Sequence, residues 1–229
     1  TTNPTLSEQI TPEICYVTVD AFTGSNKIVI NSISDESIIG YSFYKEATTD
    51  SYILIGTIDA QYDYFIDENS NSSVSSSRYK VSVVDNCLLE SEKSIFHQSL
   101  YLSMGIGLNN SVNLDWQEYE GFDVTQYTIW RGSSYNEMEF IGYVSGNQTS
   151  YTDLNPPPGT SIYQVRVAAP ICNLIEYFPD ANIFIEQDTL KSNLVENTHE
   201  DEIGLSINIA SQNPSCQDCT NGFANVFPY

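Results

Sequence analysis

Hydrophobic and polar positions alternate along short runs of the chain, and turn residues separate these runs. Runs rich in Val, Ile, Tyr and Phe with a period of two are typical of β-strands that bury one face. A helical period is not sustained anywhere. In the first half of the chain the pattern predicts strands over 14–20, 27–33, 40–47, 52–59, 62–67, 77–86 and 94–102.

The second half of the chain repeats this order. The run from Tyr127 to Asp153 keeps the aromatic and aliphatic positions of the run from Tyr41 to Asp67, 86 residues earlier, while the charged positions drift. Retained apolar positions are expected to face the interior of a sheet. The matched pairs are Phe43 and Ile129, Ile55-Gly56 and Ile141-Gly142, and Asp67 and Asp153. The predicted strands are 100–108, 111–119, 125–133, 138–145, 149–154 and 161–170, with 189–197 as the seventh.

Seven short strands in each half predict an all-β fold of two tandem antiparallel seven-stranded β-sandwiches. We expect an N-terminal lead-in at 1–12, a first sandwich at 13–98, a second at 99–196, and a linker with the truncated start of a further β module at 197–229. No Gly/Ser-rich linker separates the halves, so the connection is expected to hold the pair stiffly in line. An insertion at 173–202 lengthens the connection to the last strand.

The charge of the chain narrows the range of partners. Thirty acidic residues against eight basic ones give a formal net charge of -22. Such a charge repels phosphate backbones and anionic lipid head groups, so no nucleic acid partner is expected. No apolar run approaches the roughly 20 residues that cross a bilayer, and no direct membrane insertion is expected. The carboxylates are spread along the whole chain, which favours a solvated, self-repelling surface over a cation-binding role.

Candidate catalytic chemistry is sparse. The two histidines, His97 and His199, do not have the spacing of a nucleophile-base pair or a metal site, and no GxSxG motif occurs. We therefore expect no enzymatic activity, no catalytic or metal-binding residue and no cofactor. The segments 59–71 and 115–123 could supply carboxylates to calcium, but neither matches a D-x-D-x-D-G loop, and solvated acidic edges are the favoured interpretation.

The five cysteines indicate an oxidising compartment. The start of the first strand and the end of the sixth lie at one pole of a sandwich, so Cys15 and Cys87 are predicted to form a disulfide. Cys172 is then the odd cysteine, either free or reaching the tail. Cys216 and Cys219 have the spacing of half a zinc ribbon, but no second ligand pair follows, which favours a local disulfide or free thiols.

Aromatic residues divide into two groups. One group falls on the patterned positions of strands and is predicted to be core: Tyr79, Trp116, Tyr127 and Tyr163. The other group lies near turns and supplies the candidates for an exposed contact surface, for instance for stacking on sugars. These candidates are Tyr62, Tyr64, Tyr119, Phe122 and Tyr135.

Three motifs of the second half carry a family resemblance: "NLDW" at 113–116, "YTIWR" at 127–131 and "YQVRVAA" at 163–169. This pattern resembles fibronectin type III domains. The first half resembles the family more weakly, with Ile30 where the family usually has Trp and with "RYKVSVVD" at 78–85 as the sixth strand.

The two halves together look like the paired fibronectin-type modules in large surface proteins of gliding, type IX-secreting bacteria. The tail "NPSCQDCTNGFANVFPY" at 213–229 resembles the opening of an SprB-type gliding-motility adhesin repeat. The resemblance implies a non-catalytic, extracellular spacer or interaction module of a cell-surface adhesin. Its partners would be other modules or subunits of a surface assembly, with glycans as further candidates. The alternatives are an accessory module of a secreted polysaccharide-degrading enzyme and a module that binds glycan or calcium directly.

Overall fold

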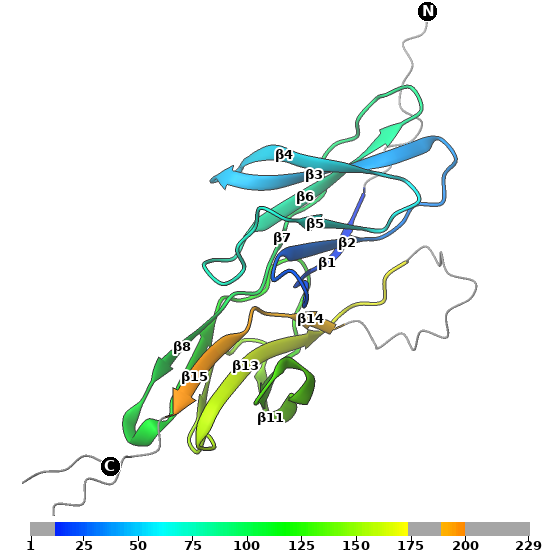
Figure 1. Cartoon of the computed structure of the whole chain (residues 1–229). Coiled ribbons are helices and arrows are strands. Elements are labelled where there is room, and N and C mark those ends of the chain that lie inside the picture. The colour runs from blue at the N-terminus through cyan, green and yellow to red at the C-terminus, as the bar shows by residue number, and fades with distance from the viewer. Residues whose placement is uncertain (1–11, 174–188, 200–229) are drawn as a thin grey trace, which may run out of the picture.

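The computed structural model describes residues 12–173 and 189–199, and these residues form four antiparallel sheets (Figure 1). Two sheets make a first sandwich, one with the strand order β1-β2-β5 and the other with the order β4-β3-β6-β7. The strands are β1 (Ile14–Val19), β2 (Asn26–Ile30), β3 (Ile38–Thr48), β4 (Ser51–Asp59), β5 (Tyr64–Asp67), β6 (Arg78–Asp85) and β7 (His97–Gln98).

The second sandwich packs a three-stranded sheet against a five-stranded one. One sheet has the order β12-β9-β8, and the other has the order β11-β10-β13-β14, with β15 also pairing with β13. The strands are β8 (Leu102–Ile106), β9 (Val112–Trp116), β10 (Gln126–Gly132), β11 (Glu139–Ser145), β12 (Ser150–Asp153), β13 (Gly159–Ala168), β14 (Thr189–Lys191) and β15 (Val195–His199). The predicted all-β fold of two tandem fibronectin type III-like sandwiches is thereby confirmed. The predicted further module falls largely on 200–229, outside the described residues.

The last strand of each sandwich differs from its prediction. The strand expected over 94–102 is reduced to His97–Gln98, and the strand expected over 189–197 is split into β14 and β15. A serine hydroxyl causes each interruption. It accepts a hydrogen bond from a backbone N–H that would otherwise be donated to a carbonyl of the neighbouring strand. Val81 N donates to Ser94 Oγ at 3.0 Å, and Val165 N donates to Ser192 Oγ at 3.0 Å.

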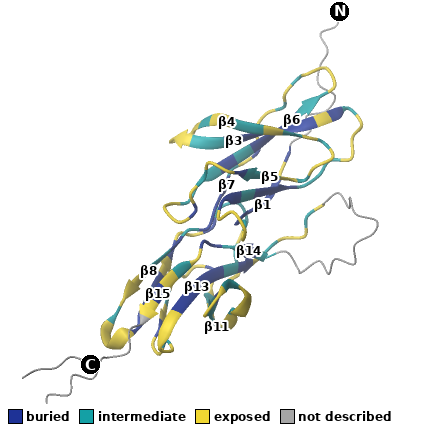
Figure 2. Cartoon of the chain, in the orientation of Figure 1, coloured by how far each residue is buried: buried dark blue, intermediate teal, exposed yellow. Residues whose placement is uncertain are grey.

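The predicted core residues are buried inside the two sandwiches (Figure 2). Phe43 and Ile129, the matched pair of the repeat, have no exposed surface. The four aromatic residues predicted for the core are confirmed, since Tyr79, Tyr127 and Tyr163 are 0% exposed and Trp116 is 5% exposed. The apolar residues that alternate with polar ones along the strands therefore form the interior of each sandwich, as expected for a sheet with one solvated face.

Steric contacts explain why the glycine of each Ile-Gly pair is retained. A Cβ atom on Gly56 would lie 2.5 Å from the ring of Phe65, and one on Gly142 would lie 2.8 Å from the hydroxyl of Tyr151. Each glycine thus lets an aromatic ring from the facing sheet lie directly on the backbone of the edge strand. The two rings are themselves 86 residues apart, so the close approach is duplicated with the rest of the pattern.

Each sandwich has its own apolar core, but the two sandwiches also pack on each other. The core of the second sandwich continues onto the outer face of the first, where it includes Cys15, Tyr16 and Val29. β1 lies beside β14, and only residues 99–101 separate β7 from β8 (Figure 1). A sheet face of the first sandwich therefore packs on the second, in addition to the short connection between them.

Candidate functional site

The most heavily constrained region of the described chain is the contact between the two sandwiches. We call this region the junction and define it as β1, β7, the β9–β10 connection at 117–125 and β14, together with the start of the segment that follows β13. Apolar packing, side-chain hydrogen bonds and a disulfide all meet there. Interfaces between domains of one chain are ordinarily more polar and more mobile than this.

Tyr119 is the central side chain of the junction. It comes from the β9–β10 connection and is 3% exposed. Its hydroxyl accepts a hydrogen bond from Val17 N of β1 at 3.0 Å and lies 2.9 Å from His97 Nδ1 of β7. Its own backbone N–H donates to the hydroxyl of Tyr127 at 3.0 Å. The prediction of Tyr119 as an exposed contact aromatic is wrong, because its ring fills the space between the sandwiches.

His97 is held in a closely fitted pocket. Its side chain is buried, and its ring lies edge-on to Tyr119 with 6.0 Å between centroids. A Cβ atom on Gly121 would lie 2.4 Å from the imidazole, and Gly121 has a φ of +143°, which favours glycine. Burial lowers the pKa of His97 to about 4, so the imidazole is neutral at neutral pH. Because the Tyr119 oxygen accepts from Val17, its proton remains free to be donated to the imidazole.

A disulfide closes the junction covalently. Cys15 is bonded to Cys172, with their Cα atoms 5.9 Å apart. The predicted Cys15–Cys87 bridge is wrong, because the Cys15 side chain points out of its own sandwich and into the core of the second. Cys87 is exposed and has a free thiol. Cys216 and Cys219 lie outside the described residues.

Backbone groups add further ties between the sandwiches. Lys191 N of β14 donates to Thr18 Oγ1 of β1 at 2.9 Å. Asn173 and the β2–β3 connection exchange two bonds: Asn173 N donates to Asn31 Oδ1 at 3.1 Å, and Ser32 N donates to Asn173 O at 2.8 Å. Asn173 directly follows Cys172, so these two bonds lie beside the disulfide and tie the same two sandwiches.

A groove of about 1220 Å³ opens beside the junction, between β6 and the β9–β10 connection. Arg78 crosses it and donates to Glu120 Oε1 at 2.7 Å and to Gln98 Oε1 at 2.9 Å. The guanidinium also lies 4.6 Å from the ring centroid of Phe96. The bond to Glu120 links the first sandwich to the second, and the bond to Gln98 fixes the guanidinium within the first.

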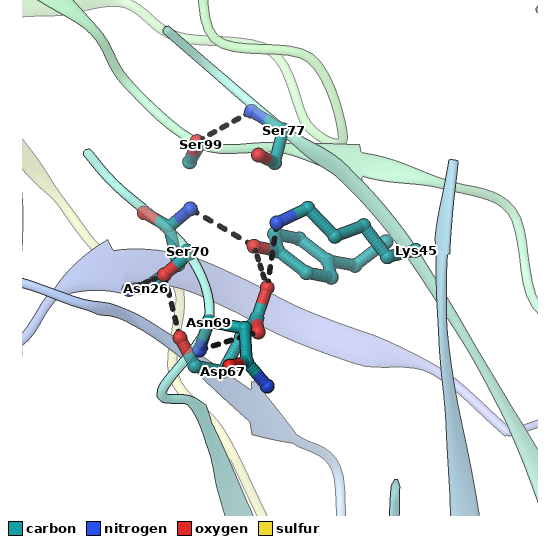
Figure 3. A network of polar contacts seen from close by, with 8 residues as sticks. Asn26, Lys45, Asp67, Asn69, Ser70, Ser77 and Ser99 are labelled. Atoms are coloured by element: carbon teal, nitrogen blue, oxygen red, sulfur yellow. Dashed lines mark hydrogen bonds and ion pairs between the residues drawn. The ribbon is translucent and has the colours of Figure 1, made fainter. Parts of the chain in front are cut away.

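A buried carboxylate network stabilises each sandwich, and it occurs twice. In the first sandwich Asp67 Oδ2 accepts from Lys45 Nζ at 2.9 Å and from the Tyr79 hydroxyl at 2.8 Å (Figure 3). The Asp67 Oδ1 atom accepts from the backbone N–H of Asn69 at 3.2 Å. The carboxylate is 3% exposed, so three donors compensate the cost of burying its charge.

The second sandwich repeats the network with a different cation. Asp153 Oδ2 accepts from Arg131 at 2.8 Å and from the Tyr163 hydroxyl at 3.0 Å, and Asp153 Oδ1 accepts from Asn155 N at 3.2 Å. Arg131 also pairs with Glu139 at 3.0 Å. In both sandwiches burial raises the pKa of the tyrosine, Tyr79 and Tyr163 respectively, and the neighbouring carboxylate adds to the rise. The networks therefore hold strand ends together, and the raised pKa of each tyrosine keeps its hydroxyl protonated at neutral pH.

The remaining predicted contact aromatics do not form one patch. Tyr62 is 51% exposed and Tyr64 is 44% exposed, and Lys27 Nζ lies 4.1 Å from the ring centroid of Tyr64. Phe122 is half-buried in the junction, 4.7 Å from the ring of Tyr119. Tyr135 is half-buried, and its hydroxyl accepts from Lys191 Nζ at 3.3 Å. The structure brings together only the two that belong to the junction.

Among residues 12–173 and 189–199, no three side chains of His, Cys, Asp or Glu are grouped so that they could share a metal ion. In the same part of the chain, no helix has the length and apolar character needed to span a bilayer.

No family model matches the chain, and no curated protein matches it. Among solved structures, a two-domain fibronectin type III segment from chicken tenascin is 12% identical with a TM-score of 0.30, covering 84% of this chain and 100% of the other. The FN1–FN3 domains of chicken CNTN1 are 12% identical with a TM-score of 0.32, covering 84% and 68%. Pectate lyase PelI from Erwinia chrysanthemi is 18% identical with a TM-score of 0.32, covering 43% of this chain.

This chain spans only 27% of the length of that pectate lyase. The fold assignment follows from the strand order of the four sheets and does not depend on these likenesses.

Proposed function

We propose that the chain is a non-catalytic, extracellular spacer in a bacterial cell-surface adhesin or gliding-associated protein of the type IX-secreted kind. The observation that carries this proposal is the junction, where a buried Tyr119, a buried His97 and the Cys15–Cys172 disulfide tie the two sandwiches together. A tandem joined in this way keeps a set distance and angle between whatever lies before it and after it, which is the property that a spacer needs.

The charge distribution supports the same role. Each of the eight basic residues is in contact with an aromatic ring or a carboxylate, and with thirty acidic residues in the chain, pairing of charges leaves a net charge of -22. The contacts are Lys27 with Tyr64, Lys45 with Asp67, Arg78 with Glu120, Lys80 with Tyr52, Lys93 with Tyr44, Arg131 with Asp153, Arg166 with Trp130 and Lys191 with Tyr135. A surface dominated by negative charge is repelled by anionic cell envelopes and keeps the spacer extended away from them.

The absence of catalysis is part of the proposal. The buried polar side chains of Tyr119 and of the two Asp-Tyr pairs are engaged in holding the fold. Sandwiches of this type ordinarily carry function in their loops. We therefore propose that partners are neighbouring modules or subunits of the surface assembly, with glycans as additional candidates at exposed aromatics such as Tyr62 and Tyr64.

An exchange experiment in the source bacterium tests this role. The segment 12–199 is replaced, within its parent protein, by two unrelated fibronectin type III domains joined by an equally short connection, and a second strain carries a deletion of the segment. A spacer predicts that the exchange retains surface attachment or gliding while the deletion loses it. Loss of function in the exchange strain, with normal surface display, would overturn the spacer role in favour of specific recognition by these sandwiches.

A further inference from the structure

We infer that the Cys15–Cys172 disulfide acts as a covalent bypass for mechanical load, so that tension entering before the first sandwich leaves after the second without passing through either core. The inference rests on the proposed function, because only a spacer in a surface protein is pulled along its length. It is carried by the position of the bridge: Cys15 is the second residue of β1, and Cys172 follows the end of β13 by four residues.

The path of force follows from connectivity. When a chain is pulled from both ends, tension runs along the shortest covalent path between the points of attachment. Here that path enters at the N-terminal side, crosses the sulfur-sulfur bond and continues from Cys172 toward the C-terminus. β2 to β13 lie entirely within the closed loop and carry no tension along their backbone. Of β1, only Ile14 lies on the loaded side.

The length removed from the load path is large. The bridge spans a sequence separation of 157 residues. At about 3.4 Å per residue, that chain would extend by roughly 530 Å if it were unfolded and pulled straight. With the bridge in place this length cannot be released, whatever happens to the packing inside the loop.

Two short strands remain exposed to the load. β14 and β15 follow Cys172 and pair with β13, over Arg166–Ala168 and Gly159–Tyr163 respectively. Tension applied beyond His199 pulls them along their axes against β13, a shearing geometry that loads their hydrogen bonds together. If they detach, the chain from 173 to 199 extends to no more than about 90 Å at about 3.4 Å per residue.

The position of the bridge gives the junction contacts a mechanical role. The contacts that Tyr119 and Lys191 make with β1 fall on Val17 and Thr18, two and three residues after Cys15. Load is therefore transferred at the place where the two sandwiches are already tied, and the interior of the closed loop stays folded. The loops of the sandwiches within 16–171 would keep their presentation under drag.

Force spectroscopy of the full chain tests the inference. The chain is held through handles at its two ends and stretched under oxidising conditions, after peptide mapping of the sample has identified the bridged cysteines. We expect a total increase in contour length of no more than roughly 240 Å before the tether breaks, because only the residues outside the bridge, 1–14 and 173–229, can extend at about 3.4 Å per residue. The Cys15→Ser/Cys172→Ser variant is expected to release an additional length of roughly 500 Å.

Two controls complete the experiment. Cys87→Ser removes the exposed free thiol and is expected to behave as the wild type. Because the double variant could fail to fold, the wild-type molecule is also stretched before and after dithiothreitol is added to the same tether, and the long release is expected only afterwards. Long release from oxidised wild-type protein, or mapping that finds Cys15 or Cys172 bridged to another cysteine, would overturn the inference. Failure of the spacer role would show in the exchange strain and would leave these force curves unchanged.

Discussion

The backbone N–H of Val17 in β1 donates a hydrogen bond to the hydroxyl of Tyr119, which lies 102 residues later in the chain. Val17 belongs to the core of the first sandwich, whereas Tyr119 belongs to the core of the second. One phenol thus links two hydrophobic interiors, and the same oxygen is 2.9 Å from His97 Nδ1. The Tyr119 hydroxyl therefore connects the packing of the two sandwiches at the junction.

Replacing Tyr119 with Phe is expected to destabilise the protein. The ring and its packing are retained, but Val17 N and His97 Nδ1 both lose a partner in a buried place. Leaving a buried polar group unpaired costs about 1–3 kcal/mol, and we expect a loss of that size in the free energy of unfolding from urea titration. Tyr62→Phe is the matched control, because Tyr62 is 51% exposed, and it should change the unfolding free energy by less than about 0.5 kcal/mol. Equal stability of Tyr119→Phe and wild type would contradict the role given to the phenol.

Stability is expected to fall as the pH is lowered through the range in which a free histidine takes up a proton. The pKa of His97 is lowered from 6.5 to about 4 in the folded protein, so the unfolded chain binds the proton more readily and stability decreases with falling pH between these values. The contribution is present above pH 6.5 and is fully lost below pH 4. Between pH 7 and pH 5 the loss is about 2 kcal/mol, since one pKa unit corresponds to about 1.4 kcal/mol.

The pH experiment compares wild type with His97→Gln, in which this contribution is absent. Urea titrations at pH 7, 6 and 5 should give a difference between the two proteins that shrinks as the pH falls. A constant difference across that range would show that His97 is not held neutral by burial.

The duplicated carboxylate networks predict a matched pair of variants. Asp67→Asn and Asp153→Asn each leave a cation and a buried tyrosine without their charged acceptor. We expect each to lower the free energy of unfolding by about 2–4 kcal/mol, because removing one partner of a buried ion pair is strongly destabilising. The effect in the first sandwich should be moderated by the partial exposure of Lys45 and in the second by Glu139, which still pairs with Arg131. Asp115→Asn, at an exposed position, is the control.

Substituting alanine for a retained glycine is expected to cause a steric clash, whereas the same substitution at another strand glycine is not. Gly142→Ala would place a methyl group 2.8 Å from the Tyr151 hydroxyl and is expected to cost about 1–3 kcal/mol. Gly105 also lies in a strand, but nothing lies within 4 Å of the position of its Cβ. Gly105→Ala should therefore be neutral or slightly stabilising. Thermal unfolding of both variants checks the pair, and equal effects would contradict the close approach of the Tyr151 ring.

A rigid junction predicts a single distance between the sandwiches. Cys87 is exposed in the first sandwich, and Leu154 is 69% exposed in the second. Spin labels at Cys87 and at Leu154→Cys, with Cys216 and Cys219 replaced by serine, should give one narrow distance distribution in pulsed electron resonance. Removing Cys15, Cys172 and the Tyr119 ring together should broaden it. A broad distribution in the intact protein would indicate two freely jointed sandwiches.

Much of the fold could be predicted from the sequence because the determinants are local and periodic. Alternation of apolar residues identifies a strand with one buried face, and the repeat of 86 residues identifies two copies of one arrangement. The pairs Asp67 and Asp153 and Gly56 and Gly142 were visible as retained positions. Their partners, the cations, tyrosines and facing rings, became apparent only when the strands were placed side by side.

The junction could not be predicted in the same way. Tyr119 lies near a turn and has the sequence signature of an exposed aromatic, and His97 has no motif around it. One signal was available: Tyr119 is 86 residues after Ile33, and the backbone N–H of each donates to a tyrosine hydroxyl of the following strand, Tyr127 and Tyr41 respectively. That correspondence places Tyr119 against the core of the second sandwich, but it does not indicate that the Tyr119 hydroxyl contacts the first sandwich.

The sequence by itself determined the class of fold, the two copies and the residues inside each sandwich, because hydrophobic alternation acts within a strand and is read without knowledge of the neighbours. The tertiary structure alone decided which outward-facing residues are buried, and with them the pairing of Cys15 with Cys172 in place of Cys87. The physical reason is that β1 has apolar residues on both faces, and only the position of the second sandwich shows what covers the outer one.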